Sequence, residues 1–306
     1  MSNIVNELQS TVMNDQNAAA IDADTELTFS RLWSLTDRFA GGLRSHDIDP
    51  GDRVGICLND PAKLLVAVFG TLRNGCVPVV FSPDLFDSEI ADGLDEVDAP
   101  ALLIDDRSPV SLISLSSSMR FILTVDIEGH FGMTYEAFLD NSGINSDGAR
   151  TGIDLVERAE DDTALIAYGK HEGEVTTRRY THNHLRKATA GDDHQPPTGE
   201  HRHLDCVQPT QPVACVYEAI ATLLNGSCYV HLGDWDPEAV HASLLDDAVD
   251  DVSVTPKQCT DLESFGYDPR EDQITVVQPV FQPLRSNHDP APDLDADTVV
   301  RPLSDG

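Results

Sequence analysis

The sequence predicts an α/β protein in which parallel-rich sheets are sandwiched by helices. Over the first hundred residues, short apolar runs typical of buried strands alternate with amphipathic helical patterns. The connections are short, and the same alternation returns after residue 204. Strands and helices that alternate in this way favour a parallel sheet covered by helices, because each helix carries the chain back to start the next strand at the same edge.

The first elements carry clear start and stop signals. A helix is expected to begin after Thr28, a suitable N-cap residue, with the apolar residues of 32–43 on one face. The turn Pro50-Gly51 ends this unit, and Asp60 and Pro61 provide a cap and a first-turn proline for a helix that stops at Gly75. The other elements predicted here are strands at 54–58, 77–81, 101–104 and 121–125 and a helix at 88–97.

Two polar loops, at 140–152 and 190–203, suggest how the chain is organised. The second loop places a division near residue 195, so we expect a first α/β subdomain over 1–190 and a partial second one over 204–285. The second part is predicted to hold helices at 215–224 and 237–245 and strands at 228–232, 252–254 and 274–277. Residues 286–306 are acidic and proline-rich and are expected to form a flexible tail.

The composition is strongly acidic. The 306 residues include 53 Asp and Glu against 20 Lys and Arg, which gives a formal net charge of −33, while 40% of the residues are hydrophobic. This favours a folded protein adapted to a very salty cytoplasm, where a Debye length of ~3 Å or less screens self-repulsion. Neither nucleic acid nor an anionic membrane is an expected partner, because both would be repelled. The alternative, a dedicated acidic binding face, fits less well because the acids are spread along the chain.

Several absences in the sequence favour a cytoplasmic protein. No run of 18 apolar residues exists, and the N-terminal residues MSNIVNELQSTVMNDQ lack the basic and apolar regions of a signal peptide. The six cysteines are scattered without a CxxC pair. They are therefore expected to be free thiols in a reducing compartment.

The most informative segment covers residues 162–185, which read DTALIAYGKHEGEVTTRRYTHNHL. It resembles the phosphate-binding segment of the adenylate-forming (AMP-binding) acyl-CoA synthetases and ligases, which reads roughly ALIxYTSGTTGxPKGVxLTHxNL. The flanks match at Ala164-Leu165-Ile166, Tyr168, Thr181-His182 and Leu185.

Further segments match the same family in order and spacing. Residues 49–54, 59–61 and 74–79 match its GxxPGDRV, NxPE and KAGAVxVP segments in turn. Residues 223–240, LLNGSCYVHLGDWDPEAV, resemble LLxGATVVLxxxFDPEAV, and Val254-Thr255-Pro256 sits at a VPT-like turn. The resemblance covers about 260 residues and implies the fold of the N-terminal domain of acyl-CoA synthetases, without their C-terminal part and lid.

In that family the loop binds ATP through glycines, hydroxyls and a lysine. The resemblance places a degenerate version of it at Gly169, Lys170, His171, Gly173, Thr176, Thr177, Thr181 and His182. Thr176 falls where the family has lysine, while Glu172 and Glu174 would put negative charge where phosphates sit. In the family the Thr-His pair is largely structural.

Two interpretations of the hairpin charges remain open. Lys170, His171, Arg178 and Arg179 could bind an anion in place of the triphosphate. The alternative, which isolated surface charges favour, is a solvated hairpin of mixed charge.

Other positions bear on the chemistry that the resemblance implies. Gln211 takes the place of the acyl-pocket histidine in the family's PLFHxxG-like segment. The later nucleotide motifs and the lid with its catalytic lysine are not found in this sequence. ATP or AMP and CoA are therefore expected as ligands only in so far as the family uses them.

His201, His203 and Cys206 form an HxHxxC pattern beside Asp205. Zinc is one interpretation, but the pattern lacks a clear fourth ligand and the usual ligand pairs. We expect no metal, and a surface loop of histidines instead.

These observations lead to three hypotheses about function. The first is a non-catalytic ligase-like protein with a binding or regulatory role, because the loop hydroxyls, loop lysine and lid are missing together. The second is half of a split acyl-CoA ligase that activates a carboxylic acid with ATP together with a partner chain, and the third is a decaying gene product. An exposed sheet edge or apolar face would favour a homodimer or association with a full-length acyl-CoA synthetase.

Overall fold

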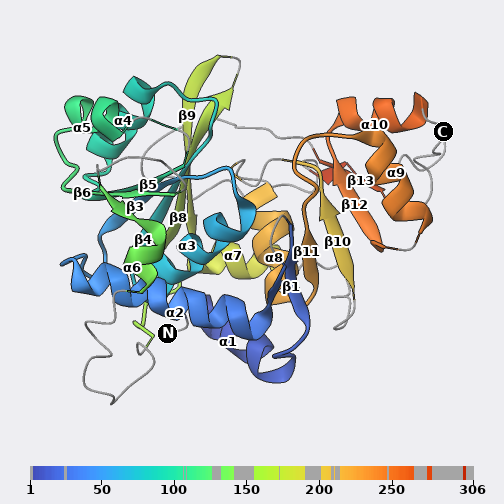
Figure 1. Cartoon of the computed structure of the whole chain (residues 1–306), viewed down its shortest axis with the longest axis horizontal. Helices are drawn as coiled ribbons and strands as arrows, with labels where there is room; N and C mark the ends of the chain where they lie inside the picture. Colours follow the sequence, from blue (N-terminus) through green and yellow to red (C-terminus); the bar gives the residue numbers. More distant parts are fainter. Residues whose placement is uncertain are drawn as a thin grey trace.

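The computed structural model describes residues 3–23, 26–105, 107, 109–125, 132–140, 155–171, 173–189, 201–207, 210, 214–246, 248–264, 274–277 and 299–300. These residues build two sheets with helices between and outside them (Figure 1). The predicted α/β architecture of helix-covered, parallel-rich sheets is confirmed.

The first sheet has the strand order β7-β6-β5-β3-β4-β8-β9. Its neighbouring strands are parallel except β8 and β9, which form an antiparallel hairpin. The strands are β3 (Arg53–Cys57), β4 (Val77–Phe81), β5 (Ala101–Ile104), β6 (Phe121–Thr124), β7 (Met133–Thr134), β8 (Thr163–His171) and β9 (Glu174–Thr181).

Helices cover both faces of the first sheet. The helices that accompany this sheet are α1 (Val5–Asn14), α2 (Phe29–Ser45), α3 (Pro61–Arg73), α4 (Asp87–Glu96), α5 (Pro109–Leu115), α6 (Tyr135–Leu139) and α7 (His182–Thr189). Figure 1 shows α4 and α5 together at one end of the view, away from the second sheet. Buried residues of α4 and α5 pack with one apolar cluster, and those of α1, α2 and α3 pack with another.

The helix starts that the sequence predicts are present. The Thr28 hydroxyl accepts a hydrogen bond from the Arg31 N–H at 3.2 Å, and Asp60 accepts from the N–H groups of Ala62 and Lys63. Side-chain caps of this kind satisfy backbone donors that the first helical turn leaves unpaired. The stop at Gly75 also holds, because its φ of +72° is one that glycine adopts without strain.

The second sheet has the order β14-β13-β12-β10-β11-β1-β2. Its inner pairs are parallel, and the pairs at both ends are antiparallel. The strands are β1 (Ala19–Asp22), β2 (Leu27–Thr28), β10 (Arg202–Asp205), β11 (Cys228–Val230), β12 (Asp251–Val254), β13 (Ile274–Val277) and β14 (Val299–Val300).

The N-terminal strands β1 and β2 belong to the second sheet, although they precede the first in sequence. Ile21 pairs with Tyr229 across parallel strands β1 and β11. Local patterns do not reveal such a long-range pairing. The division into units 1–190 and 204–285 stays a prediction; in the tail at 286–306, the described residues are Val299 and Val300.

Two groups of helices flank the second sheet. A π-helix, η2 (Ala214–Ile220), continues into α8 (Ala221–Leu224), and Figure 1 shows α7 and α8 between the sheets. On the far side lie α9 (Pro237–Leu245) and α10 (Pro256–Ser264). The helix predicted at 215–224 is therefore present, but its first turns are wider than an α-helix, a feature frequent at functional sites.

Within the described part of the chain, no helix is both long and apolar enough to cross a lipid bilayer.

Candidate functional site

The β8–β9 hairpin lies at the carboxyl edge of the first sheet, where the parallel strands end. Its tip contains Gly173, whose φ is +87°, and a side chain at this position would meet no described atom within 4 Å of its Cβ. Gly173, Glu174 and Val175 are exposed. The same edge carries the turn after β4, residues 82–86, because β4 and β8 are parallel neighbours.

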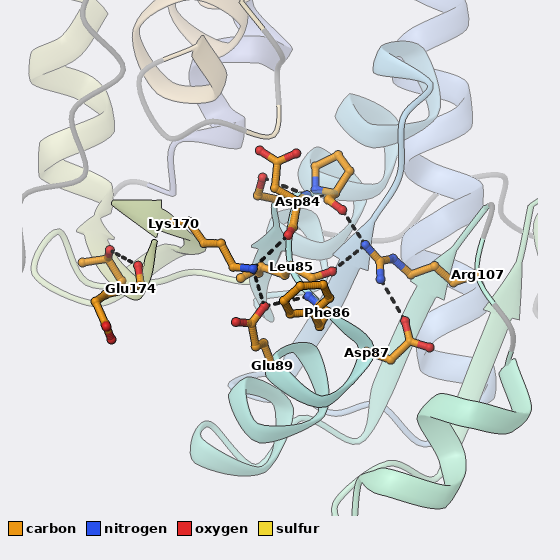
Figure 2. Close-up of polar contacts among 11 residues, drawn as sticks. Asp84, Leu85, Phe86, Asp87, Glu89, Arg107, Lys170 and Glu174 are labelled. Atoms are coloured by element: carbon orange, nitrogen blue, oxygen red, sulfur yellow. Dashed lines mark hydrogen bonds and ion pairs between the residues drawn. The ribbon is translucent and has the colours of Figure 1, made fainter. Parts of the chain in front are cut away.

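Lys170 is the lysine of the hairpin, and it is held against the turn that follows β4. Its Nζ lies 2.9 Å from Glu89 Oε2, donates to the Asp84 carbonyl at 3.1 Å, and sits 4.0 Å from the centre of the Phe86 ring (Figure 2). An ammonium group has three N–H donors. A carboxylate, a carbonyl and an aromatic face therefore already surround this charge.

Glu89 is itself fixed by two donors. Burial opposes its ionisation, but hydrogen bonds from Lys170 and from the Phe86 N–H outweigh this and hold the pKa of Glu89 below its ordinary value. The carboxylate is consequently charged at neutral pH and neutralises Lys170.

Arg107 anchors the same turn from its other side. Its guanidinium pairs with Asp87 at 2.8 Å and donates to the carbonyls of Pro83 and Leu85 at 2.6 and 2.8 Å (Figure 2). Three contacts to one short segment hold the turn in the position from which it engages Lys170.

The other predicted loop positions either make contacts within the hairpin or lie outside the described residues. The Thr176 hydroxyl donates to the carbonyl of Glu174 at 3.3 Å, and Thr177 stands opposite Tyr168 in the hairpin ladder. Gly169 is buried in β8. Glu172, Gln211 and the side chain of His171 lie outside the described residues.

Thr181 and His182 join the hairpin to α7. The Thr181 hydroxyl accepts from the His184 N–H at 3.2 Å, while His184 Nδ1 accepts from the Thr181 N–H at 3.1 Å, a reciprocal arrangement like a capping box. His182 Nδ1 accepts from the Ile4 N–H at 3.4 Å, and burial lowers the pKa of His182 to about 4. Through these contacts, Thr181 and His182 connect β9 to α7 and to the start of α1.

The two arginines of the hairpin face opposite sides of the sheet. Arg178 is 1% exposed, lies beside Tyr180, and has Nε and Nη1 without a hydrogen-bond partner among the described residues. The expectation of a wholly solvated hairpin is therefore wrong for Arg178, because alternate residues of β9 point into the core. Arg179 lines a separate cavity at the amino edge.

A cleft of about 860 Å³ lies where strands of both sheets end. It is lined by residues that follow β1, β3, β5 and β11, and α/β proteins commonly bind ligands at such an edge. Four of the lining residues are acidic, namely Asp60, Asp105, Asp234 and Asp236. The cleft is thus polar and negatively charged.

The HxHxxC segment contains strand β10 rather than the predicted surface loop: His203 and Asp205 are buried, whereas His201 and Cys206 are half-buried at its two ends. His203 is 8% exposed in β10, with Nε2 2.8 Å from Glu218 and Nδ1 2.5 Å from Asp251. Ser253 donates to Glu218 at 2.7 Å. The surface-loop expectation fails because β10 is a central strand, and carboxylates on η2 and β12 compensate the histidine. The described residues contain no group of three or more side chains suited to a metal.

The charges of this cluster follow from its contacts. Burial favours neutral His203, but the hydrogen bond to Asp251 and the adjacent carboxylate of Glu218 outweigh it and raise the pKa of His203 well above its ordinary value. Burial, reinforced by Glu218, raises the pKa of Asp205 to about 7, although Asp205 accepts hydrogen bonds from Tyr229 and the Val207 N–H. The sequence contained these residues, but not the pairing of β10 with β12 that brings them together.

Comparison with known protein families shows to which family the chain belongs. The model of the family described as AMP-binding enzyme matches residues 8–273. The chain belongs to this family. Among curated proteins, it is 26% identical over 169 residues to the olefin beta-lactone synthetase of Xanthomonas campestris pv. campestris, a match covering 53% of this chain and 29% of that protein. It is 34% identical over 67 residues to the 3-hydroxybenzoate–CoA/4-hydroxybenzoate–CoA ligase of Thauera aromatica, covering 22% and 13%.

Solved structures of AMP-binding ligases share the fold. The apo structure of MbtA from Mycobacterium smegmatis superposes with a TM-score of 0.76 at 22% identity, covering 86% of this chain and 50% of that one. The N-terminal domain of FACL13 from Mycobacterium tuberculosis gives 0.70 at 16% identity, covering 86% and 65%. This chain therefore has the fold of the N-terminal domain of these enzymes and spans about half the length of MbtA.

Proposed function

We propose that this AMP-binding family member is non-catalytic and serves a binding or regulatory role. The observation that carries the proposal is the state of Lys170, whose Nζ is engaged by Glu89, the Asp84 carbonyl and the Phe86 ring. A lysine that stabilises phosphate charge has to present its ammonium group to the ligand. Here that would require breaking an ion pair and leaving Glu89 beside the phosphates.

The acidic residues at the carboxyl edge also oppose a polyphosphate. Glu174 is exposed at the tip, and the carboxyl-edge cleft carries four aspartates. Like charges about 4 Å apart cost on the order of 4 kcal/mol at an effective dielectric constant of 20. A ligand in this cleft is therefore proposed to be neutral or cationic rather than a nucleoside triphosphate.

The direct test is ATP–pyrophosphate exchange with a panel of carboxylic acids in multimolar KCl. We expect no exchange above background. A catalytically active AMP-binding ligase, measured under the same conditions, serves as the positive control. Exchange that K170M abolishes and the charge-matched K257M leaves intact would overturn the proposal. Calorimetric titration with ATP is the second measurement, and binding with micromolar affinity would also contradict it.

The alternative is half of a split acyl-CoA ligase, which would activate a carboxylic acid with ATP together with a partner chain. It rests on the match to the AMP-binding enzyme family over residues 8–273 and on the fold shared with ligase-family structures. Co-purification of a second polypeptide, followed by exchange activity of the pair but not of either chain alone, would establish it. Inactivity of the isolated chain together with an active pair would reject the non-catalytic proposal.

Self-association, or association with a full-length acyl-CoA synthetase, belongs to the same proposal, as does a cytoplasmic location. Size-exclusion chromatography with light scattering at high salt measures the first. A clean monomer at micromolar concentration would contradict the homodimer, and failure to bind an added full-length synthetase would contradict the second partner.

A further inference from the structure

A second cavity, of about 330 Å³, lies at the edge of the first sheet opposite to the hairpin tip. Its walls include Arg53, Val77 and Thr163, the first residues of the parallel strands β3, β4 and β8. It is therefore at the amino edge of this sheet, away from the carboxyl-edge cleft.

Three arginines converge on this cavity from separate parts of the chain. Arg53 begins β3, Arg158 precedes β8, and Arg179 lies near the end of β9. Two carboxylates share the lining: Asp162 lies 3.4 Å from Arg158, and Glu96 accepts a hydrogen bond from the Tyr168 hydroxyl at 3.0 Å. In a protein with a net charge of −33, a cavity with more guanidinium groups than carboxylates stands apart from the general charge.

The arginines retain donors that the described residues do not use. Arg53 is fixed by neutral carbonyls, with Nε donating to Val97 at 2.5 Å and Nη1 to Gly51 at 3.1 Å. Arg158 approaches Asp162 through Nε. The backbone of Arg179 pairs with Ile166 in the hairpin ladder, but its guanidinium forms no hydrogen bond or ion pair with a described residue. Each guanidinium has five N–H donors, so most of the donor capacity at this cavity is unfilled.

We propose that this cavity binds a small oxyanion of the phosphate class, with Arg179 as its principal ligand and Arg53 and Arg158 at its sides. Guanidinium groups match the oxygen geometry of phosphate and form paired, charge-assisted hydrogen bonds with it. The volume admits a phosphate or a small phosphomonoester, and the acidic surface around it repels an extended polyanion such as nucleic acid.

The anion would connect segments that are distant in sequence. It would bridge the start of β3, the segment before β8 and strand β9, and so stabilise the folded first sheet by mass action. This site goes beyond the proposed role of the carboxyl-edge cleft and does not depend on it.

The test is titration of the folded full chain with inorganic phosphate, followed by calorimetry at constant pH and constant KCl concentration. We expect saturable binding of one phosphate, and an increase in the melting temperature with phosphate at matched ionic strength. Glycerol 3-phosphate serves as the phosphomonoester probe. Tighter binding of glycerol 3-phosphate than of phosphate would assign the site to a small metabolite, and the reverse would assign it to free phosphate.

Variants locate the site. R179Q is expected to weaken phosphate binding by roughly tenfold or more, because it removes a charge-assisted donor pair. R179K keeps the positive charge but loses the planar pair of N–H donors, so its affinity for phosphate should lie between those of R179Q and the wild type. R31Q, on an exposed position of α2, makes the same change in net charge and should bind as the wild type does.

Circular dichroism confirms that each variant is folded before titration. The absence of saturable phosphate binding to the folded wild type would overturn the proposal. Equal weakening by R179Q and R31Q would overturn it too, since the effect would then reflect overall charge rather than this cavity.

Discussion

The two sheets hold their buried strands in different ways. In the first sheet, β3, β4 and β5 bury mainly aliphatic side chains, such as Ile56, Val79 and Leu103. In the second, the central strands β10 and β12 bury His203, Asp205 and Ser253 beside Glu218. One sheet is stabilised chiefly by apolar burial, and the other also depends on a network of buried charges.

This difference matters because the two kinds of interior lose stability in response to different changes. Apolar burial is lost in proportion to the surface exposed and does not depend on pH. A buried ion pair adds little net stability, but losing one partner leaves an uncompensated charge in the interior. Among the central strands, those of the second sheet are therefore the ones whose stability should respond to protonation.

The largest expected effect follows from removing the histidine of the second sheet. His203→Gln leaves Glu218 and Asp251 close together without a cation, and breaking a buried pair in this way costs about 3–5 kcal/mol. Chemical denaturation at pH 7 measures the loss in the free energy of unfolding.

A matched change in the first sheet sharpens that result. Leu103→Ala, at a fully buried position of β5, should cost about 2–5 kcal/mol, and by the same amount at pH 6 and pH 8. If the Leu103→Ala loss varied with pH as much as that of His203→Gln, the proposed contrast between the sheets would not hold.

The next effect concerns His182, a buried histidine that is held neutral. Burial lowers its pKa from 6.5 to about 4, so the unfolded chain binds a proton more readily than the folded one between these values. Its contribution is complete above pH 6.5 and falls as the pH drops towards 4, by on the order of 3 kcal/mol. Unfolding measured for wild type and His182→Gln from pH 7 to pH 4 should show the wild type losing stability relative to the variant; parallel curves would contradict this.

His203 should behave in the opposite sense. Its pKa in the folded protein is raised, so its contribution is complete below pH 6.5 and is lost as the pH rises through the raised pKa. The loss should be smaller than in His203→Gln, because a neutral imidazole still donates one hydrogen bond.

Two tryptophans separate the regions in that experiment. Trp235 lies beside the second sheet, where it donates to Asp261 at 3.2 Å, whereas Trp33 lies on α2 beneath Arg73. In single-tryptophan variants, alkaline pH should perturb Trp235 fluorescence before Trp33. Simultaneous changes would mean that the sheets unfold as one unit.

The smallest expected effect is at the hairpin. Lys170 and Glu89 are 21% and 22% exposed, and pairs at this level of exposure contribute about 1 kcal/mol or less. A double-mutant cycle with K170M and E89Q measures the coupling. A coupling near zero would mean that the pair does not hold Lys170 in place, which would weaken the argument for a non-catalytic hairpin.

Much of the fold could be predicted because its signals are local. The cap at Thr28, the Asp60-Pro61 start and the strands 77–81 and 101–104 lie where the sequence indicated. The pairing of β1 with β11 could not be predicted in this way, because it joins residues about two hundred positions apart that share no local pattern.

The candidate site was predicted in part. The sequence placed a degenerate phosphate loop within 162–185, which stays a prediction. It did not indicate that Lys170 pairs with Glu89 or that Arg178 and Arg179 face opposite sides. Those facts depend on which face of β9 meets the core and on where the turn after β4 lies.

The sequence by itself determined the α/β class, the helix caps and the resemblance to AMP-binding ligases, because these rest on periodicity, capping chemistry and short motifs. The tertiary structure alone decided which charges meet: Lys170 with Glu89, His203 with Glu218 and Asp251, and three arginines at one cavity. Electrostatic interactions depend on distance and burial, and for residues far apart in sequence both are fixed only when the strands pair and the sheets pack.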